Sequence, residues 1–145
     1  MTILVTGGSG FLGRRLKKYQ PKWKYVSSSE YNLIDPAECE RLFKELEPNA
    51  IIHLAGRVGG IKENTNNQGS FFYENTMINT NIIHAAYKNG VERVLSSLST
   101  CAFPDHLSAY PFEEEQLFQG PPAKTNFSYG IAKRSLHIQS CAYRE

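Results

Sequence analysis

The sequence has little of what marks several common classes of protein. Among its 145 residues are three cysteines, two methionines and one tryptophan. Cys39, Cys101 and Cys141 are odd in number and lack the spacing of metal ligands, so neither a disulfide framework nor a metal site is expected. No apolar run approaches the length of a membrane span, and Met1 leads directly into a strand pattern rather than a signal peptide. We therefore expect a cytoplasmic chain with no membrane partner.

The chain also has little excess of charge of either sign. The formal net charge is +2, from 16 basic and 14 acidic residues that are scattered rather than clustered. This distribution gives no reason to expect a nucleic-acid partner. A hydrophobic content of 41% over 145 residues is sufficient for one globular domain with its own core.

What the chain does contain is a glycine-rich segment near its N-terminus. A β-branched run, residues 3–6, leads into Gly7, Gly10 and Gly13, and a helical pattern follows. In this order Gly7 permits a sharp turn, Gly10 lets the backbone approach a diphosphate, and Gly13 lets the helix pack closely on the strand. Free N–H groups at the helix start then bind the anion. A glycine-rich turn without a ligand is the alternative, and the flanking strand and helix argue against it.

Strand and helix patterns alternate along the rest of the chain. Strands are expected at 3–6, 24–27, 50–55 and 91–96, and helices at 14–19, from 36 to before 48, at 71–88 and at about 128–144. This alternation predicts an α/β fold, a Rossmann-type doubly wound parallel sheet. We expect Phe11, Leu12 and Leu16 to face inward, the polar stretch 62–70 to form a loop, and His53 to be a hydrogen-bonded core residue rather than a ligand.

The end of the second strand bears on the choice of cofactor. Sites for NAD place Asp or Glu there to accept from the ribose 2′-hydroxyl. Here Ser28 stands in a run of three serines, and Arg14 and Arg15 follow the glycines, which favours NADP over NAD. Glu30 lies beyond the expected position of the acidic residue.

Tyr129 and Lys133 are four residues apart and share one face of a predicted helix. An ammonium group beside a phenol favours the phenolate and lowers the tyrosine pKa from about 10 toward neutrality, which makes it a proton donor for carbonyl reduction. Taken alone, the pair is explained equally well by a solvated helix face. The order of glycine loop, Ser99, Tyr129 and Lys133 along the chain strengthens the catalytic interpretation.

These motifs resemble a known family. GGSGFLG at 7–13 and YGIAK at 129–133 resemble the glycine and catalytic motifs of the extended short-chain dehydrogenase/reductase superfamily. Within it, segments 58–61, 81–86, 99–104 and 120–122 are similar to the GDP-L-fucose synthase family, which converts GDP-4-keto-6-deoxy-D-mannose to GDP-L-fucose by epimerisation and NADPH-dependent reduction. The resemblance therefore implies NADP as cofactor, a GDP-sugar substrate and a homodimer.

The resemblance also implies roles for individual residues. Ser99 hydrogen-bonds the keto oxygen, Tyr129 donates a proton, Lys133 holds the tyrosine and the nicotinamide ribose, and Cys101 shares acid–base work in epimerisation with a downstream histidine. Without the resemblance, Cys101 reads as a small buried hydrophobe. The implied cofactor-binding residues are Gly7, Ser9, Gly10, Phe11, Leu12, Gly13, Ser28, Leu54, Ala55, Tyr129 and Lys133.

The chain departs from the family in one respect. The downstream histidine and the sugar-nucleotide domain have no counterpart in these 145 residues. We therefore expect residues 1–145 to form the N-terminal, NAD(P)-binding Rossmann part, with the sheet incomplete at its C-terminal end and the C-terminal substrate domain absent. Two alternatives remain open: another extended nucleotide-sugar epimerase or dehydratase, and a truncated NADP-binding module without catalysis.

Overall fold

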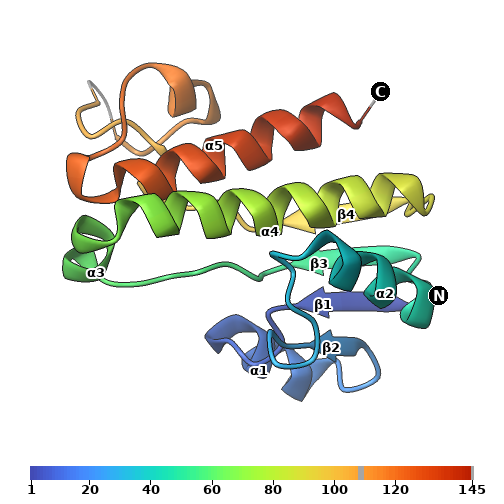
Figure 1. Cartoon of the computed structure of the whole chain (residues 1–145). Coiled ribbons are helices and arrows are strands. Elements are labelled where there is room, and N and C mark those ends of the chain that lie inside the picture. The colour runs from blue at the N-terminus through green and yellow to red at the C-terminus, as the bar shows by residue number, and fades with distance from the viewer. Residues whose placement is uncertain (108–109, 145) are drawn as a thin grey trace. The chain divides into compact units, whose positions relative to one another are not determined.

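The structure, a computed structural model, describes residues 1–107 and 110–144 (Figure 1). The chain divides into two compact units. The sheet unit contains residues 1–56 and 77–97, and the α5 unit contains residues 57–76 and those from 98 onward. Helix α4 (Gln68–Lys88) contributes to both units. Within the described residues, every helix is too short or too polar to cross a membrane.

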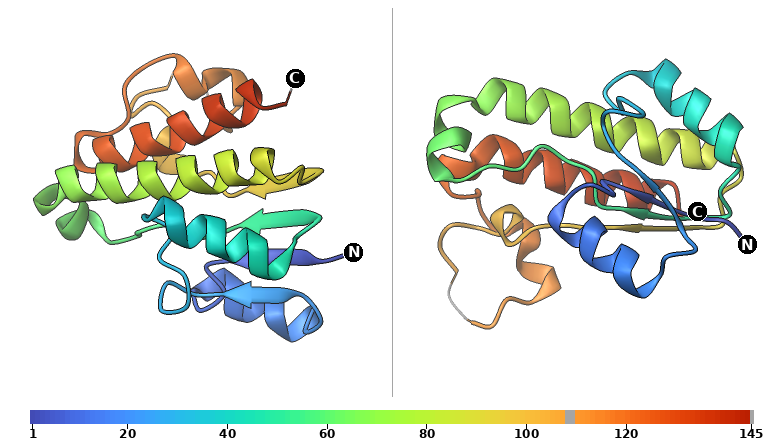
Figure 2. Two further views of the ribbon diagram at one scale, coloured as in Figure 1. Left: turned by 45° about the vertical axis from the view of Figure 1, so that its right-hand side comes forward. Right: turned by 90° about the horizontal axis from the view of Figure 1, so that it is seen from below.

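The sheet unit is built on four parallel strands. These are β1 (Ile3–Thr6), β2 (Lys24–Val26), β3 (Ala50–His53) and β4 (Arg93–Ser96), in the order β2-β1-β3-β4. All three neighbouring pairs are parallel. Helices α1 (Phe11–Tyr19) and α2 (Pro36–Leu46) lie on opposite faces of the sheet (Figure 2). The predicted Rossmann-type doubly wound parallel sheet is confirmed.

Local sequence accounts for the helix ends in this unit. Asp35 precedes α2, and its Oδ1 accepts a hydrogen bond from the backbone N–H of Ala37 at 2.9 Å. Pro36 occupies the first helical position, where a missing N–H costs nothing. Beyond α4, Gly90 adopts a positive φ of 64°, the conformation that glycine supplies at helix C-termini.

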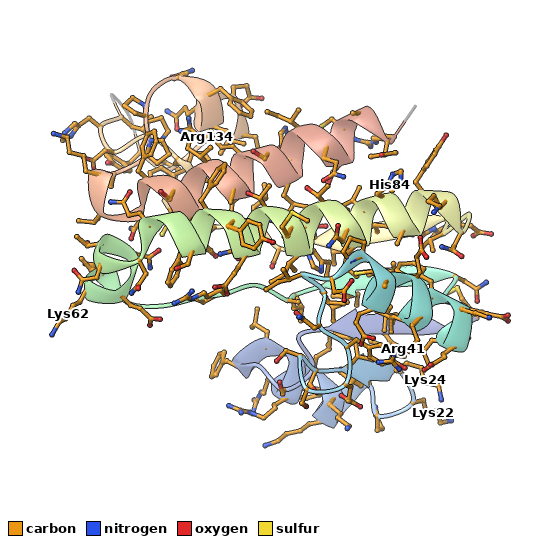
Figure 3. All side chains as sticks on the ribbon, viewed as in Figure 1. Lys22, Lys24, Arg41, Lys62, His84 and Arg134 are labelled. Carbon is orange, nitrogen blue, oxygen red and sulfur yellow. The ribbon has the colours of Figure 1, made fainter. Side chains whose placement is uncertain are left out.

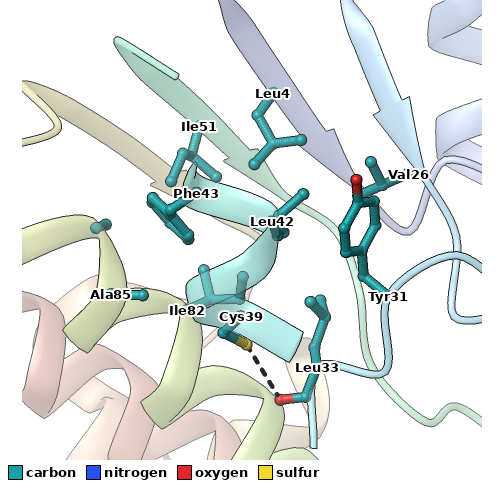
Figure 4. Close-up of a cluster of buried hydrophobic side chains, with 11 residues drawn as sticks. Leu4, Val26, Tyr31, Leu33, Cys39, Leu42, Phe43, Ile51, Ile82 and Ala85 are labelled. Carbon is teal, nitrogen blue, oxygen red and sulfur yellow. Dashed lines mark hydrogen bonds between the residues drawn. The ribbon is translucent and has the colours of Figure 1, made fainter. Parts of the chain in front are cut away.

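The main core lies on the sheet face that α2 covers (Figure 4). Leu4 of β1 and Ile51 of β3 are neighbours in the register, and both side chains are fully buried. They pack in one cluster with Leu42 and Phe43 of α2 and with Ile82 of α4. Burial of each such side chain stabilises the fold by about 1.5–3 kcal/mol.

The opposite face of the sheet is covered unevenly. Val5, Ile52 and Leu95 form one row across β1, β3 and β4. Val5 is fully buried, Ile52 is partly buried and Leu95 is 65% exposed. Apolar surface is thus left open along the row toward β4, one of the two edge strands of the sheet.

The α5 unit is mainly helical. It contains α3 (Ile61–Asn66), the first part of α4, the short 3₁₀ helices η1 (Thr100–Ala102), η2 (Glu114–Phe118) and η3 (Lys124–Asn126), and the long α5 (Phe127–Ala142). The predicted loop at 62–70 is therefore wrong, because α3 and the start of α4 occupy it. Polar side chains satisfy the helix backbone here: Asn64 Nδ2 donates to the carbonyls of Gly59 and Gly60, and Asn67 Nδ2 donates to Glu63.

Candidate active site

The turn between β1 and α1 is held by backbone contacts that exclude a β-carbon at Gly7 and at Gly13. Gly7 has a φ of 71°, and a Cβ there would lie 2.8 Å from the Ala55 nitrogen and 2.9 Å from the Leu54 carbonyl carbon. A Cβ on Gly13 would come closer than 3.0 Å to the Gly7 carbonyl oxygen. The end of β3, with the predicted cofactor residues Leu54 and Ala55, thus lies directly against the turn.

The start of α1 offers the features that a diphosphate needs. Gly10 is the N-cap residue and has no side chain to occupy the first-turn N–H groups, while a Cβ there would touch only the Gly7 oxygen, at 3.1 Å. Nη1 of Arg14 donates to the carbonyl of Ser9 at 3.0 Å, which places a cation beside the turn. Donors, positive charge and open backbone fit a dinucleotide diphosphate.

Phe11 and Leu12 do not face inward as predicted. Phe11 is 81% exposed and Leu12 is 56% exposed, whereas Gly13 is buried. The physical reason is the close approach of Gly13 to the turn: the face of α1 that meets β1 carries hydrogen rather than an apolar side chain. Both residues remain at the N-terminus of α1, where their backbone N–H groups belong to the predicted diphosphate site.

At the end of β2, Ser28 is exposed in the turn 27–30. The same turn places the carboxylate of Glu30 at the end of β2, although Glu30 lies beyond the position expected for an acidic residue in the sequence. Glu30 Oε2 accepts hydrogen bonds from the Ser27 nitrogen at 2.8 Å and from the Ser27 hydroxyl at 2.6 Å. These bonds lower the pKa of Glu30. The end of β2 therefore presents an ionised carboxylate as well as hydroxyl groups.

In the α5 unit, Ser99 and Cys101 are placed by η1. Ser99 is the N-cap residue of this helix, and its Oγ accepts from the Cys101 nitrogen at 3.2 Å. Cys101 is a free, partly buried thiol. The polar Ser-Thr-Cys segment therefore forms one tight turn that presents a hydroxyl and a sulfur together.

Tyr129 and Lys133 lie in the first half of α5. Both are buried, Tyr129 at 9% exposure and Lys133 at 3%. The Ser99 side chain lies within hydrogen-bonding reach of the Tyr129 phenol, and Nζ of Lys133 lies 5.9 Å from the centre of the Tyr129 ring. The structure thus brings the predicted catalytic residues Ser99, Cys101, Tyr129 and Lys133 into one unit, and their catalytic roles remain predictions.

The electrostatics of this pair differ from the sequence expectation. Burial raises the pKa of Tyr129 above its ordinary value, a hydrogen bond with Ser99 lowers it, and the neighbouring Cys101 raises it. Burial also lowers the pKa of Lys133. The predicted lowering of the tyrosine pKa by the lysine is wrong for this structure, because burial is the largest influence on the phenol and Ser99, not Lys133, is the group that lowers its pKa.

Three residues that sequence analysis missed hold η1 against α5. A Cβ on Gly130 would come closer than 3.0 Å to the Cys101 carbonyl oxygen. Arg134, labelled in Figure 3, donates from Nε to the Ala102 carbonyl at 2.6 Å. Asn126 donates from Nδ2 to Sγ of Cys101 at 3.5 Å. Gly130 lies inside the YGIAK motif, so its position was visible in the sequence, but the contact with Cys101 was not.

His53, in the sheet unit, is a buried and satisfied core residue, as predicted. Its Nδ1 is hydrogen-bonded with the Thr6 hydroxyl at 2.7 Å, and its Nε2 with Oδ1 of Asn79 at 3.1 Å.

Comparison with known proteins identifies the family. The sequence model of the NAD dependent epimerase/dehydratase family matches residues 3–145. The chain belongs to this family. Among curated relatives, a probable GDP-L-fucose synthase of Drosophila melanogaster is 39% identical over 150 residues, and the GDP-L-fucose synthase of Dictyostelium discoideum is 37% identical over 151 residues. Each alignment covers 99% of this chain but 46% and 47% of the relative, so the chain spans about half the length of the relatives it matches.

Solved structures in the family agree. A GDP-L-fucose synthetase of Naegleria fowleri bound to NADP is 40% identical, with a TM-score of 0.86 over 98% of this chain and 47% of that protein. A GDP-mannoheptose C4 reductase of Campylobacter jejuni with NADP bound has a TM-score of 0.90 at 28% identity, over 98% of this chain and 46% of that protein. The resemblance to fucose synthases noted in the sequence is confirmed, and the family consists of NAD(P)-dependent enzymes.

Proposed function

We propose that this chain is the NADP-binding part of an epimerase/reductase that converts GDP-4-keto-6-deoxy-D-mannose to GDP-L-fucose. The observation that carries the proposal is the placement of Ser99 within hydrogen-bonding reach of Tyr129, with Cys101 on the same turn as Ser99 and Lys133 one helical turn beyond Tyr129. The relatives that share this length of sequence and are named fucose synthases support the choice of substrate.

Each of these residues has a distinct task in the proposed reaction. Bound NADPH supplies a hydride to C4 of the sugar. Ser99 hydrogen-bonds the keto oxygen, and Tyr129 gives that oxygen its proton. Lys133, buried next to the tyrosine ring, holds the phenol and the nicotinamide ribose in place. Cys101 exchanges a proton with a carbon next to the ketone, where the carbonyl makes the C–H bond acidic.

The sheet unit supplies the nucleotide site in this proposal. The N–H groups at the start of α1 bind the diphosphate, and Gly10 leaves the room for it. Ser28 lies at the strand end where the 2′-phosphate of NADP binds. The carboxylate of Glu30 at the same place disfavours that phosphate, and the cation of Arg14, held at the Ser9 carbonyl of the β1–α1 turn, favours it.

We also propose that the chain needs a further polypeptide segment to complete the reaction. Two observations support this: the chain spans less than half of its fucose synthase relatives, and Leu95 on edge strand β4 stays 65% exposed. By itself the chain is expected to bind a dinucleotide without completing epimerisation. The homodimer and the cytoplasmic location expected from the sequence remain predictions.

The decisive experiment is a fluorescence titration of the purified chain with NADPH and with NADH, combined with two alanine variants. Gly10→Ala adds a methyl group that the fold accommodates with a small shift, since its one near contact is the Gly7 oxygen at 3.1 Å. The variant is expected to fold and to lose at least about tenfold in NADPH affinity, because the methyl group blocks the diphosphate. Gly60→Ala, with nothing within 4 Å of the new Cβ, is the matched control and is expected to bind like the parent chain.

Each outcome tests a different part of the proposal. Tighter binding of NADH than of NADPH contradicts the cofactor assignment, and equal affinity of the Gly10→Ala and parent chains contradicts the location of the site. Formation of GDP-fucose from the keto sugar and NADPH by the isolated chain would refute the need for a further segment.

A further inference from the structure

Asn126 takes the N-cap position of α5 but does not act as a cap. Asparagine is favoured at this position because its side-chain oxygen accepts from an N–H of the first helical turn. Here the side chain makes no such bond to the described first turn of α5. Its amide Nδ2 instead donates to Sγ of Cys101, 25 residues earlier in the chain, at 3.5 Å. The Asn126 side chain thus contacts a sulfur atom instead of capping the helix.

The contact is fixed from both of its ends. On the α5 side, the Asn126 backbone N–H donates to the Ala123 carbonyl at 2.9 Å. On the η1 side, Ser99 holds the Cys101 nitrogen, and Arg134 holds the neighbouring Ala102 carbonyl at 2.6 Å. These bonds hold the two backbone segments in place, so the amide and the sulfur face each other from fixed points of the α5 unit.

We infer that Asn126 is a positioning residue for Cys101: its amide N–H orients the sulfur and favours the deprotonated form. A donor hydrogen-bonded to an ionisable group stabilises the charged form of that group. The thiolate, rather than the thiol, is the basic and nucleophilic species of cysteine. The inference rests on the proposed function, in which Cys101 exchanges a proton with the sugar.

The proton balance of the step is simple. When Cys101 acts as base, the C–H bond of the sugar breaks, an S–H bond forms, and the electron pair moves to the keto oxygen as an enolate. The configuration inverts because the partner group acts from the opposite face of the sugar: when Cys101 is the base, a second acid returns a proton to carbon, and when Cys101 is the acid, a second base has removed the C–H proton, the S–H proton passes to carbon and the thiolate returns. The Asn126 amide keeps its own protons throughout and stabilises sulfur only while it is negative.

The test follows alkylation of Cys101 by iodoacetamide as a function of pH in the whole chain, with each cysteine scored separately by peptide mass spectrometry. In Asn126→Ala, the pH–rate profile of Cys101 is expected to move to higher pH, so that the rate near neutral pH falls by about threefold to tenfold. Asn126→Asp, which keeps the shape but replaces the donor by a carboxylate, is expected to move the profile further. Greater access to the sulfur raises the high-pH plateau and leaves the position of the profile unchanged, so the two effects are distinguishable.

Two controls accompany the variants. Ser128→Ala removes a neighbouring bond of the first turn of α5, from Ser128 Oγ to Gln68 Oε1 at 3.1 Å, and is expected to leave the Cys101 profile in place. The exposed Cys141 in the same chain is expected to react alike in all variants. An unchanged or lowered Cys101 profile in both Asn126 variants, or an equal shift in Ser128→Ala, overturns the inference.

Failure of the proposed function is seen separately. NADPH titration of the parent chain tests that function without reference to Cys101. If the Asn126 variants shift the Cys101 profile but the chain binds no dinucleotide, the amide–sulfur contact is supported and the enzymatic role is contradicted. If the chain binds NADPH but the Asn126 variants leave the profile unshifted, the proposed function stands and the role of Asn126 is contradicted.

Discussion

Gly130 lies so close to Cys101 that a β-carbon on Gly130 would come within 3.0 Å of the Cys101 carbonyl oxygen. The same β-carbon would lie 2.9 Å from Cβ of Pro122. The helix that carries Tyr129 and Lys133 therefore rests directly on the backbone of the turn that carries Ser99 and Cys101. The absence of one side chain sets the spacing of the candidate catalytic residues.

Gly130→Ala is expected to destabilise the chain by about 1–3 kcal/mol, because neither the Cys101 backbone nor the proline ring can yield without moving α5. Urea unfolding followed by circular dichroism measures the effect. Gly69→Ala in α4 is the control, since its Cβ meets nothing within 4 Å, and alanine is the better helix former. An equally stable Gly130→Ala chain would contradict the close packing of η1 on α5.

Tyr129 is expected to stay protonated throughout the neutral range in the chain without cofactor. Burial raises its folded pKa above the ordinary value of 10.0, so its contribution to stability is full below pH 10.0 and is lost as the pH rises beyond it. The difference in ultraviolet absorbance between the parent chain and Tyr129→Phe, followed with pH, isolates this phenol from the other seven of the eight tyrosines. Ionisation below pH 10.0 would show that Lys133 outweighs burial.

The three thiols are expected to differ sharply in reactivity. Cys39 is 1% exposed, its Sγ donates to the Leu33 carbonyl, and burial raises its pKa to about 12. Cys39 should therefore resist iodoacetamide in the folded chain and react once urea unfolds it, whereas exposed Cys141 reacts at once.

Ionisation of the Cys39 thiol is expected to lower the stability of the folded chain at alkaline pH. Because its folded pKa is raised from 9.0 to about 12, the stabilisation is full below pH 9.0 and is lost between these values. Unfolding curves of Cys39→Ala should fall less steeply with pH in this range, while Cys141→Ser should follow the parent chain. Rapid labelling of Cys39 under native conditions would contradict the buried core of Figure 4.

Leu95→Lys is expected to reduce self-association of the chain. Leu95 is a 65% exposed apolar side chain on an edge strand, the arrangement through which sheets join one another. Sedimentation velocity over a range of protein concentrations measures the change. Tyr19→Lys on α1 alters a side chain of the same 65% exposure away from the strand edge and should have little effect. Equal effects of both changes would mean that β4 has no special part in association.

Sequence patterns anticipated most of the sheet unit because its elements are specified by near neighbours. Asp35 and Pro36 start α2 through contacts within one turn, and Gly7 supplies a backbone angle that its own residue type permits. The same local reasoning failed at 62–70. Polar residues there suggested a loop, but Asn64 bonds to the carbonyl of Gly59 just before α3 and Asn67 bonds to the carbonyl of Glu63 within it.

The sequence by itself determined the order of the glycine turn, the serine–cysteine segment and the Tyr129–Lys133 pair, because each depends on residue type and short spacing. Only the tertiary structure decided which atoms surround those groups and how burial changes their pKa values. It set Asn126 against the sulfur of Cys101 across 25 residues. It also reversed the expected direction of the Tyr129 pKa, since loss of water depends on how the chain packs around a group rather than on which residues precede or follow it.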